Sequence, residues 1–257
     1  MPRAVLITGA SSGIGKALAL YYAGDGARLA LIGRDGGRLE TVAQECRKLG
    51  ASVDCAAMDV RSRAELAEWI TAFDRAAPID LLIANAGLMA GTPPAGGIEP
   101  PDAGLRVMET NVLGVLNTVQ PLLGPMMARG RGQIAIVSSI AAFLPLPDAP
   151  SYSASKSAVL NYGLSLRALL APHGIAVSVV CPGYVDTPMM QRESGAKPFK
   201  MSSDRAAALI GAGLDRNRAV IAFPPLMAWA TRLHGVLPDP LRRLLLRRAR
   251  FSVDDNG

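Results

Sequence analysis

Hydrophobic residues occur along the chain in short continuous runs, separated by longer segments with a different spacing. The runs are rich in Val, Ile, Leu and Ala and do not alternate strictly with polar residues, which is typical of strands covered on both faces. Seven runs are predicted to form strands, at 4–7, 28–32, 52–57, 81–84, 133–137, 176–180 and 219–223.

Between these runs, apolar residues recur with the spacing of helices. The clearest helical segments are 15–23, 38–49, 63–76, 105–128 and 155–170. Repeated strand–helix units indicate a parallel sheet with helices on both faces, and right-handed crossovers would make it doubly wound. We therefore predict an α/β fold with a single Rossmann-like sheet of about seven strands, formed by residues 1–257 as one domain.

The composition agrees with this prediction and argues against a disordered, a membrane-spanning or a secreted protein. The chain has 257 residues, of which 50% are hydrophobic and 19% charged, so intrinsic disorder is excluded. The stretches 110–128 and 168–185 carry no charged side chain, but each contains proline and polar residues and is not typical of a membrane span. A turn at Thr8 follows the first apolar run at once and leaves no room for a signal peptide, so we expect a cytoplasmic protein.

The residues that most often bind metals are few and far apart. The chain has three cysteines, Cys46, Cys55 and Cys181, and two histidines, His173 and His234. This spacing predicts no disulfide framework and no metal site.

A glycine-rich turn follows the first predicted strand. Gly9, Gly13 and Gly15 lie in the segment T-G-A-S-S-G-I-G, together with Ser11, Ser12 and Ile14. Glycines let the backbone approach a ligand closely, and the start of the next helix offers free N–H groups to a phosphate. The segment indicates a phosphate-binding turn, with a purely structural glycine turn as the alternative.

Two further positions could carry acid–base chemistry. Tyr152 and Lys156 are four residues apart and would share one helix face, where a nearby cation lowers the pKa of a phenol. Ser139 follows the strand 133–137, at the edge where parallel sheets bind ligands, and its hydroxyl could bind a substrate oxygen. Each feature alone could be a chance surface pair or an ordinary turn.

In combination, these features resemble the short-chain dehydrogenase/reductase family, in its compact branch of about 250 residues. The resemblance is strong over residues 3–190 and rests on the T-G-x-x-x-G-x-G turn and the Y-x-x-x-K pair. Ala84 replaces the first asparagine of the family's N-N-A-G segment, and Ala142 stands where many members have glycine. The other matching positions are Asp59-Val60, Asn85-Ala86-Gly87, Asn111, Ser139, Pro182-Gly183 and Thr187.

The resemblance implies hydride transfer between a nicotinamide and a carbonyl or secondary alcohol. Tyr152 would give or take the proton, Lys156 would lower its pKa, Ser139 would orient the substrate oxygen, and Asn111 would hold a relay water. The implied cofactor-binding residues are Gly9, Ser11, Ser12, Gly13, Ile14, Gly15, Arg34, Asp59, Val60, Asn85, Ala86, Gly87, Tyr152, Lys156, Pro182, Gly183, Val185 and Thr187.

The second predicted strand is followed by Gly33-Arg34-Asp35. NAD-binding members usually carry an acid at the tip of this strand, where Gly33 has no side chain. Arg34 could bind a 2′-phosphate, although Asp35 could also turn inward. We predict NADP(H) in preference to NAD(H).

Residues 184–205 are expected to form a lid over the substrate. Paired methionines give an adaptable apolar surface, and the predicted substrate contacts are Ser139, Phe143, Tyr152, Tyr184, Met189 and Met190. They favour a lipophilic ketone, such as a 3-oxoacyl, sphingoid or steroid-like ketone, with ordinary core packing as the alternative.

The net charge of +6 is concentrated near one end, since residues 217–257 hold seven arginines and three aspartates. Residues 224–257 are expected to form a basic amphipathic extension. It could cover its own domain or a partner chain, or lie on an anionic membrane at its inner surface, and nucleic acid is not favoured. The resemblance implies a homodimer or homotetramer built on helices 105–128 and 155–170.

Two other functions remain open. A sugar-nucleotide epimerase or dehydratase of the extended branch would be longer and would use another glycine spacing. An NADP-binding scaffold or sensor would be expected to lack a member of the catalytic set, whereas Asn111, Ser139, Tyr152 and Lys156 are all present.

Overall fold

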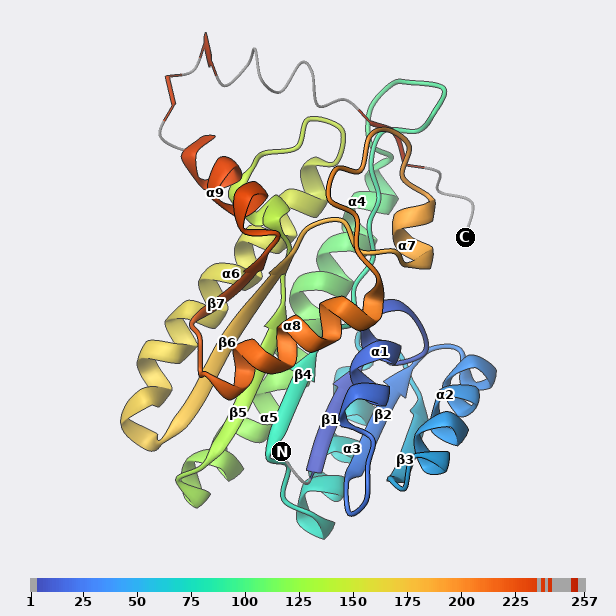
Figure 1. Ribbon diagram of the computed structural model, residues 1–257, viewed down its shortest axis with the longest axis vertical. Coiled ribbons are helices and arrows are strands. Elements are labelled where there is room, and N and C mark those ends of the chain that lie inside the picture. Colours follow the sequence, from blue (N-terminus) through green and yellow to red (C-terminus); the bar gives the residue numbers. More distant parts are fainter. Residues whose placement is uncertain (1–3, 235–236, 239, 242–250, 254–257) are drawn as a thin grey trace.

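The fold is a seven-stranded parallel sheet, as predicted. The computed structural model describes residues 4–234, 237–238, 240–241 and 251–253. Its sheet order is β3-β2-β1-β4-β5-β6-β7 (Figure 1), and each neighbouring pair is parallel. The strands are β1 (Ala4–Thr8), β2 (Arg28–Gly33), β3 (Ser52–Ala57), β4 (Leu81–Ala84), β5 (Gly132–Val137), β6 (Ile175–Pro182) and β7 (Val220–Phe223).

Successive residues of each strand face opposite sides of the sheet, and each side is covered by its own set of helices. Val5 and Ile7 of β1 pack on the side covered by α1, α2 and α8, whereas Leu6 packs on the side covered by α3, α5 and α6 (Figure 1). The α-helices are α1 (Gly13–Tyr22), α2 (Gly36–Lys48), α3 (Arg63–Ala76), α4 (Pro101–Met108), α5 (Gly114–Arg129), α6 (Pro150–Leu170), α7 (Pro188–Gln191), α8 (Ser203–Asp215) and α9 (Pro225–His234). The short helical turns are η1 (Glu109–Leu113), η2 (Ile140–Phe143) and η3 (Ala171–His173).

The helix predicted over 105–128 is not continuous. It begins earlier, at Pro101, and the π-helical turn η1 separates α4 from α5. The side chain of Asn111 lies in this turn and binds both backbone groups of Leu88, with its Oδ1 accepting from N–H (2.8 Å) and its Nδ2 donating to the carbonyl (2.9 Å). Such turns are common at functional sites.

Helix α6 begins at Pro150, five residues before the predicted start. Proline suits the first turn of a helix because its missing N–H has no partner there anyway. The earlier start brings Tyr152 into the first turn of the helix that also carries Lys156.

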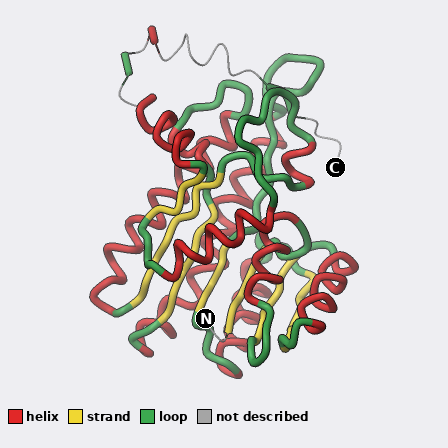
Figure 2. Tube along the Cα trace, viewed as in Figure 1, coloured by secondary structure: helices red, strands yellow, loops and turns green. Residues whose placement is uncertain are grey.

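Because all strands run in the same direction, their carboxyl ends meet at one edge of the sheet. The loops after β1, β4, β5 and β6 gather there, above the strands in Figure 2. Parallel sheets of this kind bind ligands at this edge.

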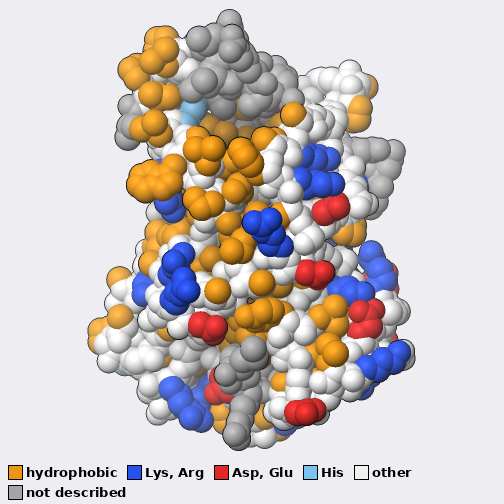
Figure 3. Space-filling model, viewed as in Figure 1, with side chains coloured by type: hydrophobic (Ala, Val, Ile, Leu, Met, Phe, Trp, Pro, Cys, Tyr) orange, Lys and Arg blue, Asp and Glu red, His pale blue; other side chains and the backbone are white. Residues whose placement is uncertain are grey.

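Helix α9 exposes apolar side chains. Leu226, Trp229 and Leu233 are each at least 60% exposed, and hydrophobic side chains gather over this helix at the upper left of Figure 3. The basic helix expected further along falls mainly on 242–250, which lie outside the described residues. No helix in the described part of the chain is long and apolar enough to cross a membrane.

Candidate active site

A cavity of about 600 Å³ runs along the carboxyl edge of the sheet. It extends from Arg34 and Asp59, after β2 and β3, to Tyr152 and Met189. The predicted site residues that line it are Gly9, Ser11, Ser12, Gly13, Ile14, Arg34, Asp59, Val60, Asn85, Ala86, Gly87, Ser139, Tyr152, Lys156, Pro182, Gly183, Val185, Thr187, Met189 and Met190.

The turn between β1 and α1 depends on its glycines. Gly9 and Gly13 have positive φ angles of 67° and 54°, and a Cβ on Gly15 would overlap the carbonyl oxygen of Gly9. Gly15 does not line the cavity but lets α1 start directly behind the turn. The N-cap residue Ser12 makes no side-chain capping bond, and the first turn of α1 has no acidic residue. This turn fits an anionic diphosphate, because its N–H groups point outward from a helix start.

The loop after β4 is tied to the same turn by Thr8. The hydroxyl oxygen of Thr8 accepts from the backbone N–H groups of Asn85 and Ala86, both at 3.1 Å. In return, Nδ2 of Asn85 donates to the carbonyl of Thr8 at 3.0 Å. These bonds fix the floor of the cavity.

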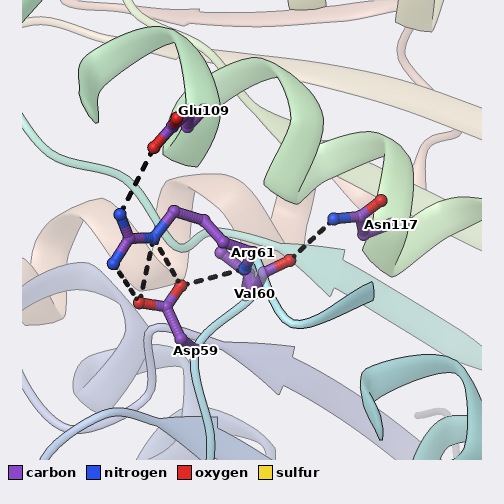
Figure 4. Close-up of polar contacts among 5 residues, drawn as sticks. All are labelled: Asp59, Val60, Arg61, Glu109 and Asn117. Atoms are coloured by element: carbon purple, nitrogen blue, oxygen red, sulfur yellow. Dashed lines mark hydrogen bonds and ion pairs between the residues drawn. The ribbon is translucent and has the colours of Figure 1, made fainter. Parts of the chain in front are cut away.

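The loop after β3 is held by an ion-pair network (Figure 4). Arg61 binds the carboxylate of Asp59 at 2.8 Å and that of Glu109 at 3.3 Å. Desolvation raises the pKa of Asp59, but hydrogen bonds from Arg61 outweigh it and the pKa is lowered. Asn117 donates to the carbonyl of Val60 at 3.0 Å. The outer end of the cavity is thereby fixed to η1 and α5.

Arg34 is exposed and borders the cavity after β2. The neighbouring Asp35 is the N-cap of α2, where it accepts from the backbone N–H of Arg38 at 2.9 Å and from its Nε at 2.7 Å. The bond to that N–H is the main reason that the pKa of Asp35 is lowered. Asp35 also borders the cavity, but its carboxylate is already engaged by Arg38.

Tyr152 and Lys156 meet at the inner end of the cavity. Nζ of Lys156 lies 5.7 Å from the centre of the Tyr152 ring and donates to the carbonyl of Val137 at 3.1 Å. The hydroxyl of Ser138 donates to the carbonyl of Lys156 at 2.7 Å. Lys156 is 5% exposed, so its ammonium is held in place by the end of β5.

Burial raises the pKa of Tyr152 to about 12; a hydrogen bond with Ser139 acts in the opposite direction, and Glu193 raises the pKa further. Burial also lowers the pKa of Lys156 to about 8. From the sequence we predicted a lowered tyrosine pKa on the basis of the nearby cation alone; in the folded chain the largest effect is desolvation, which raises the pKa instead. Tyr152 therefore keeps its proton at neutral pH, as a proton donor must.

Asn111 is fully buried behind the cavity and does not line it. Its Nδ2 donates to the hydroxyl of Ser155 at 3.0 Å, and that hydroxyl donates to the carbonyl of Tyr152 at 2.7 Å. A Cβ on Gly87 would lie 3.1 Å from Oδ1 of Asn111 and 3.3 Å from Nζ of Lys156. Gly87 thus leaves space between these two groups.

Two of the predicted substrate residues lie away from the cavity. Phe143 ends η2 and borders a second hollow with Leu144 and Leu146, where the guanidinium of Arg232 lies 4.5 Å from its ring centre. Tyr184 is partly buried, and its carbonyl accepts from the N–H of Met201 at 3.1 Å. The roles assigned to Phe143 and Tyr184 stay predictions.

Several residues that line the cavity were not singled out from the sequence. Only Arg38 had a visible signal, since it lies three residues after an aspartate that could cap a helix. The others belong to strand ends, a loop or short helical turns; the whole set is Ile32, Arg38, Met58, Thr110, Val137 and Pro188. Gly33, Asp35 and Ser138 also line the cavity; the first two entered the cofactor prediction, and Ser138 precedes the predicted Ser139.

Sequence comparisons identify relatives over most of the chain. The short chain dehydrogenase family model matches residues 3–197. An uncharacterized oxidoreductase of Myxococcus xanthus is 36% identical over 96% of this chain and 98% of its own length. The 11-beta-hydroxysteroid dehydrogenase-like 2 protein of Arabidopsis thaliana is 32% identical over 95% of this chain and 80% of its own.

Solved structures share the fold. Actinorhodin polyketide ketoreductase with NADPH has a TM-score of 0.76 at 28% identity, over 88% of this chain and 97% of its own. A short chain dehydrogenase from Mycobacterium paratuberculosis bound to NAD has a TM-score of 0.75 at 25% identity, over 86% of this chain and 94% of its own.

The family match, the full-length relatives and the parallel sheet agree with one another. The chain belongs to the short-chain dehydrogenase family of oxidoreductases, which act on CH–OH and C=O groups with NAD(P).

Proposed function

We propose that the protein reduces a lipophilic ketone with NADPH. The observation that carries this proposal is one continuous cavity, with the glycine turn along it and Tyr152, Lys156 and Ser139 at its inner end. The residues of the turn would hold the diphosphate of the cofactor, and those at the inner end would act on the carbonyl.

When bound, the nicotinamide cofactor supplies the hydride that the carbonyl carbon accepts. The hydroxyls of Ser139 and Tyr152 bind the carbonyl oxygen, and Tyr152 transfers its proton to that oxygen as negative charge develops on it. The ammonium of Lys156 stabilises the tyrosinate that is left, because the two side chains share one helix face.

The preference for NADP(H) is supported by charge at the end of β2. Gly33 leaves no carboxylate at the strand tip, Asp35 is bound to Arg38, and the exposed guanidinium of Arg34 borders the cavity. A 2′-phosphate would form a charge-assisted bond with Arg34. Similar structures hold NADPH in one case and NAD in the other, so direct affinities for both cofactors test this part.

The ketone class is supported by Met189 and Met190, which give the cavity an apolar end. Residues 184–205 would act as the lid over that end. A ketoreductase and a hydroxysteroid dehydrogenase-like protein among the similar proteins agree with a ketone as substrate.

Assembly and location complete the proposal. Leu105, Met108, Leu113 and Met127, on α4, η1 and α5, are exposed apolar side chains suited to a homodimer or homotetramer. We place the protein in the cytoplasm, with peripheral contact to anionic membrane through the extension 224–257; size-exclusion chromatography and sedimentation with anionic vesicles test these two points.

The enzymatic test is a ketone panel of graded size with NADPH or NADH, in which loss of cofactor absorbance reports turnover. The proposal expects faster turnover with NADPH and with apolar ketones. NADPH binding without turnover of any ketone would favour the scaffold alternative.

A further inference from the structure

The segment Phe251–Val253, called the strap below, lies beside the reactive end of the cavity. Val253 is 2% exposed and packs with Met89 and Ala149. Tyr152 and Met189 pack against the same small cluster. The strap thus joins the site from a part of the chain far beyond β7, the last strand of the sheet.

Four hydrogen bonds donated by backbone N–H groups attach the strap to three separate loops. The N–H of Val253 donates to the carbonyl of Thr92 at 2.9 Å, and the N–H of Phe251 donates to the carboxylate of Asp148 at 3.0 Å. The N–H of Ser252 donates to the hydroxyl of Ser194 at 2.8 Å, while the N–H of Ser194 donates to the carbonyl of Ser252 at 2.9 Å.

These three loops also supply Met89, Ala149 and Met189 to the cluster against which Tyr152 packs. Thr92 belongs to the loop after β4, Asp148 to the loop after η2, and Ser194 to the proposed lid. The N–H of Thr92 also donates to the carbonyl of Asp148 at 2.7 Å. The strap therefore connects the lid to two loops that are already bound to each other.

The chain leaves room for the close approach of the strap. A Cβ on Gly91 would overlap the carbonyl oxygen of Asp148 and would lie 3.0 Å from a methyl group of Val253. Asp148 is 1% exposed, so its carboxylate is buried where it receives the N–H of Phe251. A buried acceptor aimed at this N–H indicates a built contact.

We propose that the strap supports the outer side of the substrate site, where Val253 packs in the cluster that Tyr152 and Met189 contact, and that Val253 thereby limits the bulk of the ketone. This inference rests on the proposed function. With its carbonyl at Tyr152, a ketone would direct one substituent toward Met89, Met189 and Val253. Linear or compact apolar ketones would therefore be favoured over polycyclic ones.

Two deletions and one substitution test the strap. Deletion of residues 251–257 removes it, whereas deletion of residues 254–257 keeps it and is the matched control. Val253→Ala removes two methyl groups and so enlarges the space at the substrate end, without removing any backbone hydrogen bond. For each chain we would measure the Kd for NADPH, kcat/KM for a compact and a polycyclic ketone, and the exchange rate of the Ser194 amide.

The strap predicts that deletion of 251–257 shifts the ratio of kcat/KM values at least tenfold toward the polycyclic ketone, and that Val253→Ala shifts it severalfold. The Kd for NADPH should be the same in every chain, and the chain that lacks residues 254–257 should keep the wild-type ratio of kcat/KM values. The amide of Ser194 should exchange faster only in the chain that lacks residues 251–257. The proposed role of the strap is overturned if the ratio of kcat/KM values is unchanged in both the 251–257 deletion and Val253→Ala. It is also overturned if the 251–257 deletion leaves the exchange rate of the Ser194 amide unchanged. Failure of the intact chain to turn over any ketone overturns the proposed function instead, and Ser194 exchange then still reports whether the strap holds the lid.

Discussion

At the scale of single residues, the chemistry depends on groups whose ionisation is set by burial. Tyr152, with a pKa raised to about 12 by desolvation, and Lys156, with a pKa lowered to about 8, are both protonated at neutral pH. That is the state needed to donate a proton to a carbonyl oxygen. The pairing was predictable from sequence spacing, but the direction of the tyrosine shift was not, because it depends on how the fold covers the phenol.

Glu193 lies close enough to Tyr152 to raise its pKa, and sequence reasoning did not single it out. Burial raises the pKa of Glu193 itself from 4.5 to about 7, and Lys197 acts in the opposite direction. The folded chain therefore binds this proton more tightly than the unfolded chain, and the resulting stability is present below pH 4.5 and lost as the pH rises through 7.

Glu193→Gln should remove this pH dependence. The free energy of unfolding of the wild type, relative to that of the variant, should fall as the pH rises from 4.5 to 7 and then level off. Urea unfolding at several pH values measures it, with the exposed Glu68→Gln as control. Parallel curves for wild type and Glu193→Gln would show that the Glu193 carboxyl is not perturbed.

Arg34 should determine the choice of cofactor. Hydrogen bonds to charged groups contribute about 1.5–3 kcal/mol, so Arg34→Ala should raise the Kd for NADPH about tenfold to a hundredfold. The Kd for NADH should hardly change, since NADH lacks the 2′-phosphate. Fluorescence titration measures both values, and Arg63→Ala, an exposed arginine that does not line the cavity, serves as control. An equal rise in the Kd values for NADPH and NADH would rule out this role of Arg34.

At the scale of elements, the strands were the most predictable part and the helix ends the least. All seven strands lie within two residues of their predicted bounds, and the central ones do so because buried parallel strands are continuous apolar runs. The edge strand β3 is mostly exposed or partly buried. The π-helical turn at Asn111 could not be foreseen, since its partner Leu88 comes from a loop distant in sequence. The start of α6 is fixed partly by Glu99, whose carboxylate accepts from the N–H of Ser151 at 3.2 Å, another long-range contact.

The junction of β1 and α1 gives a prediction at this scale. Gly15→Ala places a methyl group against the carbonyl oxygen of Gly9, so α1 must move away from the turn. We expect a loss of NADPH affinity of at least about tenfold and a lower melting temperature, because overpacking typically destabilises by about 1–3 kcal/mol.

Gly24→Ala is the matched control for that change. Gly24 follows the same helix, and a Cβ there would meet no atom within 4 Å. Calorimetry and NADPH titration should show no loss for Gly24→Ala. Equal results for the two variants would show that the close junction does not shape the binding turn.

At the scale of the whole molecule, the two halves of the cavity differ in how far the sequence predicts them. The cofactor half is formed by strand ends and a glycine turn, which leave fixed spacings in the sequence. The substrate half is formed by loops, and the strap packs in the same cluster as Tyr152 and Met189, from outside the lining, through long-range contacts. Phe143 was accordingly predicted at the substrate but borders another hollow, whereas Val253 was not foreseen and packs in the cluster that includes Tyr152.

The central claim is that this cavity transfers a hydride from NADPH to a ketone while Tyr152 supplies the proton. Single-turnover reaction of NADPH that carries deuterium at both C4 positions with the ketone that performs best in the panel tests it directly. We predict deuterium on the carbinol carbon of the product and a rate about 10²–10⁴-fold lower in Tyr152→Phe, since general acid catalysis contributes that much. The Kd for NADPH should remain nearly unchanged in this variant. Transfer at the same rate in Tyr152→Phe, or no deuterium in the product of the wild type, would contradict the claim.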